Sequence, residues 1–306
     1  IKTSMGFKRI LLEEYIKTNK KINVKNFKND FQILSVLRNL KIIGIFTRLS
    51  IRDKKDSYLK LIPYAWKLIE QRIDEDVSLI AITWVPTNGG LVNPAEGIGK
   101  IAQKFNIPFL LDGCQAVGQM PIDVKKIGCD FFSATGRKFL RGPRGTGFLY
   151  ISEKWLDRLH PVMIDHFGAP WVGINAYQLR SDARRFETWE NSYALRAGLA
   201  RAVQYASEIG IEKIHQRTWA LARLCRDMLK EVKGITLTDL GKEKCGIVSF
   251  YIEGKDCFEV VCQMQKKGIT IGTSSPTSTL IDSQVRSLPM LLRASPHYYN
   301  LSLIHI

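Results

Sequence analysis

The sequence predicts an α/β protein with a mostly parallel sheet covered by helices, followed by a smaller C-terminal α+β domain. From residue 76 onward, short apolar segments alternate with segments of helical periodicity, an order typical of parallel strands joined by helices. The segment 78–85 (SLIAITWV) is almost continuously apolar. Strands of that kind are buried on both faces of a sheet, which again indicates a parallel sheet with helices on both sides.

The predicted elements follow one another in the order that this fold requires. Asn93 precedes Pro94, so we expect Asn93 to cap a helix that begins at Pro94 and ends near Phe105. The further expected strands are 107–111, 130–134, 145–151 (antiparallel to its neighbours), 247–252 and 290–294. The further expected helices are 58–72, 124–127, 193–209, 211–233 and 257–267.

The formal net charge of +16 arises mostly in the N-terminal quarter of the 306-residue chain. Residues 1–73 contain 17 lysines and arginines against 6 aspartates and glutamates. Their sequence has neither a basic helix stripe nor a basic–aromatic motif, so we interpret the charge as a composition bias and expect no nucleic-acid partner. No apolar run reaches the ~18 residues of a membrane-spanning helix, and the N-terminus lacks the pattern of a signal peptide. We therefore expect a cytoplasmic protein without a membrane partner.

The six cysteines are scattered along the chain and form no C-x-x-C pair. In a chain of this length without a secretion signal, such cysteines are typical of free thiols rather than of disulfides. Their spacing also matches none of the usual zinc-binding patterns. We predict no metal centre.

Two residues of opposite charge are predicted to face each other at one edge of the sheet. Asp112 directly follows the strand at 107–111, and Lys138 follows the strand at 130–134. Ligands of open α/β sheets bind outside the carboxyl ends of the strands. Either residue alone is explained as well by a turn cap or a surface lysine, but together they favour a site for a pyridine-aldehyde cofactor. A carboxylate keeps the ring nitrogen protonated, and a lysine of lowered pKa forms a Schiff base with the aldehyde.

Groups suited to bind a phosphate lie beside Lys138. Thr135 offers a hydroxyl and Arg137 offers a cation, both of which are common phosphate ligands. Three glycines within 142–147 allow the following chain to turn sharply and to approach a ligand closely. The segment therefore has the parts that a phosphorylated aldehyde cofactor needs.

The segment 110–150 resembles the cysteine desulfurase branch of the class V aminotransferases, which are pyridoxal 5'-phosphate (PLP) enzymes of fold type I. The motifs that carry the resemblance are D-G-x-Q-x-V, P-x-D-V, C-D-F, T-G-x-K and G-P-x-G-x-G. The resemblance implies that Lys138 holds the cofactor and that Asp112 pairs with its pyridinium nitrogen, so both are candidate catalytic residues. It also implies that Gln115 contacts the phenolic oxygen of the cofactor and that Thr135 binds its phosphate.

Two further blocks extend the resemblance over residues 76–300. The block R-A-S-P-H-Y-Y-N begins at Arg293 and resembles the family segment whose arginine binds the substrate carboxylate, a bidentate task that suits a guanidinium group. The tripeptide R-F-E at 185–187 matches a weaker third block. The resemblance implies an amino-acid substrate and a homodimer in which each active site is completed by the partner subunit.

Two positions depart from the desulfurase pattern. Arg137 stands where desulfurases usually have histidine, although its charge still suits the cofactor phosphate. The segment 272–277 (GTSSPT) contains no cysteine, whereas desulfurases carry their nucleophilic cysteine there, and only a thiolate attacks sulfur. We therefore predict an aminotransferase-like enzyme acting at the Cα of an amino acid, with Lys138 also serving as general base. A desulfurase, lyase or epimerase of the same family is the alternative.

The two ends of the chain do not resemble the family. Residues 37–72 resemble the C-terminal end of sugar kinases of the aminoglycoside phosphotransferase type, without the catalytic aspartates, and 301–306 lack the acidic character of the family. We hypothesise a reading frame that joins two genes near 71–76, so an inactive fragment or fusion is a further alternative. The predicted domains are a basic, mostly helical segment 1–75, a partial PLP-binding domain 76–195 and a small domain 196–306.

Overall fold

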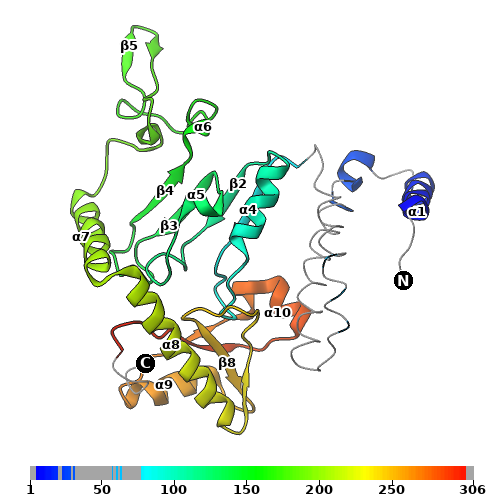
Figure 1. Ribbon diagram of the computed structural model, residues 1–306, viewed down its shortest axis with the longest axis vertical. Helices are drawn as coiled ribbons and strands as arrows, with labels where there is room; N and C mark the ends of the chain where they lie inside the picture. The colour runs from blue at the N-terminus through cyan, green and yellow to red at the C-terminus, as the bar shows by residue number, and fades with distance from the viewer. Residues whose placement is uncertain are drawn as a thin grey trace. The chain divides into compact units, whose positions relative to one another are not determined.

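The computed structural model describes residues 5–19, 23–28, 30, 31, 57, 60, 63 and 77–300. The chain divides into two compact units, Ile1–Val77 and Ser78–Ile306 (Figure 1). The first unit contains helix α1 (Met5–Thr18). The helix predicted at 58–72 and the kinase-like segment lie almost entirely outside the described residues, and the bounds of the three predicted domains remain predictions.

The first sheet confirms the mostly parallel arrangement that the sequence predicts. Its strand order is β1-β2-β3-β4, with β1, β2 and β3 parallel and β4 antiparallel to β3. Fully buried side chains of β2 and β3, among them Phe109 and Phe132, form the centre of its core. The strands are β1 (Ile80–Thr83), β2 (Phe109–Asp112), β3 (Phe131–Thr135) and β4 (Gly147–Ile151). The connecting helices are α4 (Ala95–Lys104) and α5 (Val124–Ile127).

The start of α4 differs from the prediction. Pro94 is the N-cap residue, and the helix has no side-chain cap among the described residues. The Nδ2 of Asn93 instead donates a hydrogen bond to the carbonyl of Thr83 at 2.7 Å, which turns the side chain toward β1. Asn93 thereby ties the loop that follows β1 to the carboxyl end of that strand.

A second sheet forms the C-terminal α+β part, as predicted. Its order is β7-β8-β10-β9, and all neighbouring strands are antiparallel. The sequence did not indicate two of these strands, which have only three residues each. The strands are β7 (Ile235–Leu237), β8 (Val248–Ile252), β9 (Gly272–Ser274) and β10 (Leu291–Ala294). The helices beside them are α9 (Cys257–Lys266), the 3-10 helix η3 (Pro276–Thr279) and α10 (Leu280–Arg286).

Two long helices lead from the first sheet to the second (Figure 1). They are α7 (Tyr193–Ile209) and α8 (Ile211–Glu231), and Gly210 separates them with a positive φ of 93°. The ends of both helices lie within two residues of the predicted ends, because the apolar periodicity and the glycine mark them clearly. Among the described helices, none combines the length and the apolar character that crossing a bilayer requires.

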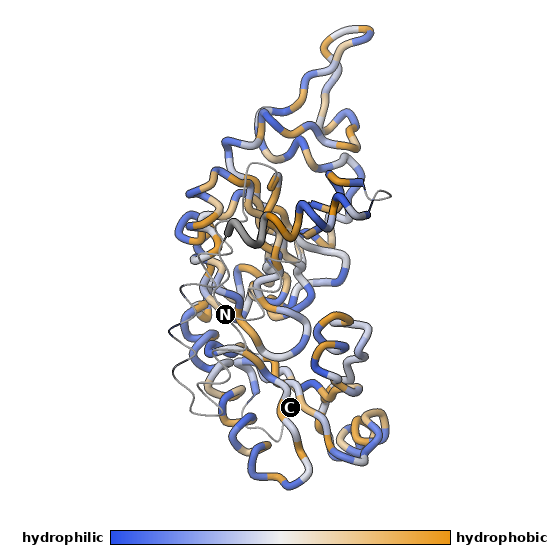
Figure 2. The backbone as a smooth tube through the Cα atoms, turned by 90° about the vertical axis from the view of Figure 1, so that its right-hand side faces the viewer, coloured by the Kyte–Doolittle hydropathy of each residue, from blue (hydrophilic) through white to orange (hydrophobic). Residues whose placement is uncertain are grey.

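A hairpin that the sequence did not predict projects from the end of β4 (Figure 1). It follows α6 (Glu153–Leu156) and consists of β5 (Trp171–Gly173) and β6 (Ala176–Tyr177), and η2 (Ala183–Phe186) leads from it to α7. Hydrophobic and hydrophilic residues are mixed along the projecting segment (Figure 2). Ile174 at its tip is 92% exposed. The two short strands of the hairpin have no clear alternation of apolar and polar residues, so sequence periodicity does not predict them.

Candidate active site

Asp112 lies at the carboxyl end of β2, in the middle of the parallel part of the sheet. The register places it between Thr83 of β1 and Ser133 of β3. Its Oδ1 accepts a hydrogen bond from the backbone N–H of Cys114 at 2.9 Å, and its Oδ2 accepts one from the hydroxyl of Thr83 at 3.4 Å. These two donors hold the half-buried carboxylate at the sheet edge where the sequence predicted a ligand.

The glycine after Asp112 is required by close packing. A Cβ atom at Gly113 would lie 2.0 Å from the ring of Phe132, a fully buried side chain of β3. Any larger residue would displace the phenylalanine or the turn that carries the carboxylate. The D-G pair of the motif is thus explained by packing as well as by the chemistry of the acid.

Lys138 follows β3 in a turn that is closed by backbone hydrogen bonds. The N–H of Arg141 donates to the carbonyl of Lys138 at 2.9 Å, and the N–H of Gly142 donates to the carbonyl of Gly136 at 2.7 Å. Arg141 has a positive φ of 63°, a backbone conformation that is uncommon for a residue with a side chain. The turn therefore presents Lys138 in a defined, half-buried position.

Burial lowers the pKa of the Lys138 amine. The thiol of Cys114 and the carboxylate of Asp112 oppose this shift, whereas the charges of Arg137 and Arg293 increase it. Groups from β2, from the turn after β3 and from β10 therefore act on one amine. A lysine whose pKa is lowered is more often neutral, and only the neutral amine attacks a carbonyl carbon.

Arg293 of β10 carries an unused hydrogen-bond donor. Its Nε is buried and has no hydrogen-bond partner in the described part of the chain, and burial lowers the pKa of its guanidinium group. Because an unsatisfied buried donor costs stability, such groups are rare outside functional sites. The position of Arg293 within reach of the Lys138 charge suits the predicted role of binding a substrate carboxylate.

Three residues that the sequence did not single out support this arrangement. His297 is almost fully buried, and its Nε2 donates to the carbonyl of Phe139 at 2.7 Å, because its Nδ1 accepts the N–H of Tyr298 at 2.8 Å. The guanidinium group of Arg141 donates to the hydroxyl of Tyr298 at 2.8 Å. The turn of Lys138 and the segment that follows Arg293 are thereby held together. Only the proximity of His297 to the R-A-S block could have drawn attention to it.

After His297 and Arg141, the third of these residues is Cys114. Its thiol lies within hydrogen-bond reach of the Asp112 carboxylate, and burial is the largest cause of its raised pKa. The backbone N–H of Thr135 and the charge of Lys138 act on the same thiol in the opposite direction. Cys114 therefore lies between the acid and the amine that the sequence predicted to face each other, and its place in the D-G-C-Q motif was the available signal.

The structure gives less direct information on the other predicted site residues, which are Gln115, Thr135 and Arg137. Gln115 is buried, with 4% of its surface exposed, and the Thr135 hydroxyl donates to the carbonyl of Thr146 at 3.3 Å. Arg137 is exposed and acts on Lys138 through its charge. The described interactions of these three residues are with other parts of the protein, so their roles toward a cofactor remain predictions.

The weaker third sequence block has a structural role. Arg185 is 6% exposed, and its guanidinium group donates to the carbonyls of Arg180 and Leu156. These bonds close the base of the projecting hairpin. The described contacts of Arg185 therefore lie with the hairpin rather than with Lys138.

The assembled residues fit a cofactor that carries an aldehyde and a basic ring nitrogen. A half-buried carboxylate and a lysine of lowered pKa follow neighbouring strands at the carboxyl edge of a parallel sheet, and the charge of an arginine with an unused buried donor acts on that lysine. This combination defines the class of α/β enzymes that hold a cofactor through a lysine.

The chain belongs to the aminotransferase class-V family, whose pattern it matches over residues 59–302. It is 31% identical over 203 residues to a probable cysteine desulfurase of Halalkalibacterium halodurans, a match that covers 66% of this chain and 50% of the relative. It is 30% identical over 237 residues to a probable cysteine desulfurase of Methanothermobacter thermautotrophicus, covering 76% and 59%. The apo cysteine desulfurase of Thermococcus onnurineus NA1 is a structural neighbour, with a TM-score of 0.72, 26% identity, and 78% and 60% of the two chains covered.

The comparisons confirm the fold class that the sequence predicted, and they place the chain in the predicted family, whose members are PLP-dependent enzymes. The chain spans only about half of the length of the curated relatives that it matches. The family match begins at residue 59, so it includes residues 59–72 of the kinase-like segment 37–72.

Proposed function

We propose that residues 78–300 form part of a PLP-dependent, aminotransferase-like enzyme that acts at the Cα of an amino acid. The observation that carries the proposal is the position of half-buried Lys138 in the turn after β3, beside the strand that ends at Asp112, where burial lowers the pKa of its amine. The unpartnered Nε of Arg293 is a second support, because it supplies a buried donor for a carboxylate.

Each residue would have a distinct task toward the cofactor and the substrate. Lys138 would hold the cofactor, Asp112 would keep the ring nitrogen protonated, and Gln115 would contact the phenolic oxygen. Thr135 and Arg137 would bind the phosphate. When bound, PLP supplies an electron sink that acidifies the Cα–H bond of an amino acid.

The chain itself would position the substrate and move the proton. The guanidinium group of Arg293 binds the α-carboxylate, which fixes the orientation of the Cα–H bond. Burial keeps a larger fraction of the Lys138 amine neutral than in an exposed lysine. A neutral amine at that place accepts a proton at Nζ and returns it, so Lys138 serves as general base and then as general acid.

Cysteine desulfuration is a second candidate, because the curated relatives bear that name. The segment in which desulfurases carry their cysteine forms β9 and η3 here, and it presents the hydroxyls of Ser275 and Thr277, which lie 2.9 Å apart. A hydroxyl does not replace a thiolate in persulfide formation. Cys262 on α9 is exposed, so desulfuration would have to use that thiol or another donor.

Peptide mapping after borohydride reduction tests the proposal. Purified protein incubated with PLP and reduced should carry the cofactor on Lys138, and Lys138→Ala should carry none there. Lys125→Ala, which removes an exposed lysine of α5, is the matched control and should keep the modification of Lys138. Equal modification of many surface lysines in all three proteins would contradict the proposal and favour an inactive fragment or fusion.

The reaction type is tested by product analysis. A 2-oxo acid formed from the amino acid supports transamination, racemised amino acid supports epimerisation, and sulfane sulfur formed from cysteine supports a desulfurase or lyase. Loss of sulfane sulfur in Cys262→Ala would place the nucleophile on α9.

The remaining expectations concern the whole protein. A homodimer and a cytoplasmic location are expected from the family, and light scattering of the purified chain tests the first, since a monomeric mass would contradict it. The hypothesis of two genes joined near residues 71–76 is tested by long-read sequencing across that junction. One continuous native gene would refute it.

A further inference from the structure

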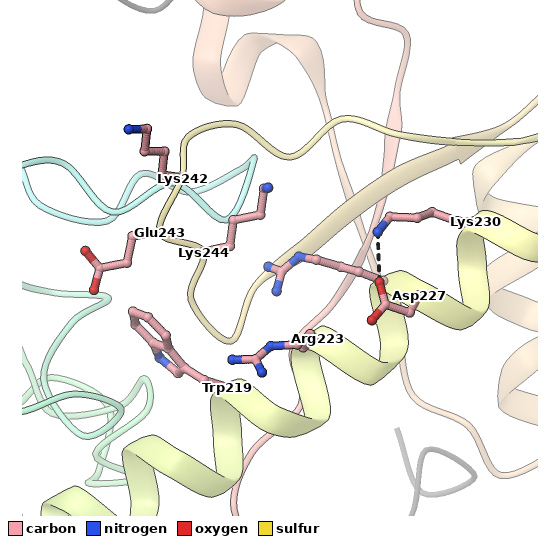
Figure 3. Close-up of a pocket in the computed structure, with 8 residues that line it drawn as sticks. Trp219, Arg223, Asp227, Lys230, Lys242, Glu243 and Lys244 are labelled. Carbon is pink, nitrogen blue, oxygen red and sulfur yellow. Dashed lines mark hydrogen bonds and ion pairs between the residues drawn. The ribbon is translucent and has the colours of Figure 1, made fainter. Parts of the chain in front are cut away.

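A basic cavity of about 510 Å³ lies between α8 and the loop at 240–245, and it shares no residue with the candidate active site (Figure 3). Five of its eight lining residues are lysines or arginines, two are carboxylates, and the eighth is Trp219. Its volume lies within the range of roughly 300–1,000 Å³ that is typical of small-molecule sites. The cavity is therefore large enough for a ligand and carries an excess of positive charge.

At the floor of the cavity, hydrogen bonds fix the structure, and the charges of Arg226 and Asp239 neutralise each other. The Nε of Arg226 donates to the carboxylate of Asp239 at 2.5 Å, and both side chains are more than nine-tenths buried. The Nη2 of the same arginine donates to the carbonyls of Cys245 and Ile247 at 2.8 and 2.6 Å. Arg226 thus fixes the loop to α8 through its Nε and Nη2.

The other side of the loop is fixed as well. The N–H of Leu240 donates to the carbonyl of Gly89 at 2.7 Å, and the N–H of Cys245 donates to the carbonyl of Gly90 at 2.8 Å. A Cβ at Gly90 would lie 2.6 Å from the guanidinium group of Arg226, so this approach requires glycine. A loop held on both sides presents its lysines with little loss of entropy on binding.

The upper part of the cavity has an uncompensated charge. Lys230 pairs with Asp227 at 2.8 Å. Arg223, Lys242 and Lys244 have no ion pair among the described residues, although the charge of Asp227 reaches Arg223 and that of Asp239 reaches Lys244. Figure 3 shows Arg223 extending from α8 and Lys244 from the loop, with the ammonium end of Lys244 turned away from Arg223. Because the lysine stem is flexible, both cations can reach one anion with several oxygens.

Trp219 adds an apolar, planar surface at one end of the same space (Figure 3). Its ring is held by an edge contact with His215 at 4.3 Å between centroids and by packing against the first core. A bare anion would use the cations but not this ring. Aromatic side chains beside cations are the combination that stacks a base and binds its phosphates.

We propose that this cavity binds a mononucleotide, with the phosphates between Arg223 and Lys244 and the base against Trp219. The site is separate from Lys138 and does not depend on the proposed function of that residue. Its floor is bonded to the loop that follows β1, which leads back to the edge of the first sheet.

Calorimetric titration of the full chain with ATP, pyrophosphate and adenosine tests the proposal. We expect ATP to bind more tightly than pyrophosphate, and adenosine more weakly than either. Arg223→Ala/Lys244→Ala should weaken ATP by about tenfold or more, and Trp219→Leu should reduce the advantage of ATP over pyrophosphate without abolishing pyrophosphate binding.

The matched control removes the same charge elsewhere. Lys255→Ala/Lys267→Ala replaces two exposed lysines of the C-terminal part that do not line the cavity, and it should bind ATP like the wild type. Equal weakening in both double variants would show binding by overall charge and overturn the proposal. Absence of ATP binding to a wild-type chain with an intact unfolding transition would overturn it as well.

Discussion

The candidate active site and the basic cavity each contain an arginine with a buried Nε, and the two arginines differ in how that donor is used. Arg226 has a buried carboxylate and two carbonyls as partners, with Asp239 at 2.5 Å. The Nε of Arg293 has no partner among the described residues. The comparison teaches that burial alone does not indicate function. Breaking a buried ion pair is costly, whereas an unpartnered buried donor costs stability and leaves a group that can bind a ligand.

Replacing each arginine by alanine should have opposite effects on stability and on ligand binding. Arg226→Ala leaves Asp239 buried and unpaired, so we expect a loss of about 3–5 kcal/mol in the free energy of unfolding. Arg293→Ala should change that free energy by less than about 1 kcal/mol but weaken amino-acid binding by about 10- to 100-fold. Denaturant unfolding and amino-acid titration of the PLP-loaded protein measure the two effects. Equal destabilisation by both variants would remove the distinction.

His297 links the turn of Lys138 to the segment of Arg293, and it should give the stability a pH dependence. Burial lowers the pKa of His297 from 6.5 to about 4. The unfolded chain therefore binds the proton first as the pH falls, and stability is lost between pH 6.5 and about 4, by ~3 kcal/mol at most.

The matched variant is His297→Gln, which retains a donor toward the carbonyl of Phe139 but does not titrate. The free energy of unfolding of this variant should fall less steeply than that of the wild type over the same pH range. Parallel pH profiles of the two proteins would show that His297 does not cause the dependence.

Gly113→Ala should have a smaller effect on the fold and a clear effect on the site. The added Cβ would lie 2.0 Å from the ring of Phe132, so we expect a loss of about 1–3 kcal/mol from overpacking and a displaced Asp112. Phe132→Leu in the same chain should recover part of both losses. Thermal unfolding and PLP affinity are the measurements, and a fully stable Gly113→Ala protein would show that the turn adapts without cost.

Cys114→Ala should have the smallest effect. The thiol contacts the carboxylate of Asp112 and is one of several groups that act on Lys138. Removing one such contact is worth about 0.5–1.5 kcal/mol, so PLP affinity should change by no more than about tenfold. Loss of all PLP binding would instead assign Cys114 a direct contact with the cofactor.

The sequence predicted the first sheet well, because its strands follow from short-range patterns, and the same patterns place the predicted acid and lysine at strand ends. Apolar runs mark β1, β2 and β3, and the D-G-x-Q and T-G-x-K motifs lie at the ends of β2 and β3. What was missed depends on contacts far apart in the chain. The hydrogen bond from His297 to Phe139 joins residues 158 positions apart, and Arg226 meets the loop at 240–245 only in the folded structure. No local pattern contains that information.

The same limit explains the two corrections within the elements. Asn93 is a good cap by residue type, but Pro94 is the N-cap residue and the Nδ2 of Asn93 donates to the carbonyl of Thr83, a partner ten positions earlier that only the fold brings near. The strands β7 and β9 have three residues each, too few for a period-two pattern, and they form because β8 and β10 offer free edges.

The most direct test of the account is a crystal structure of the chain soaked with PLP. The account predicts that the aldehyde carbon is bonded to Nζ of Lys138, that a carboxylate oxygen of Asp112 lies within hydrogen-bond distance of the ring nitrogen, and that the guanidinium group of Arg293 faces the open side of the ring. A cofactor held at another lysine, or a ring nitrogen that faces away from Asp112, would contradict it.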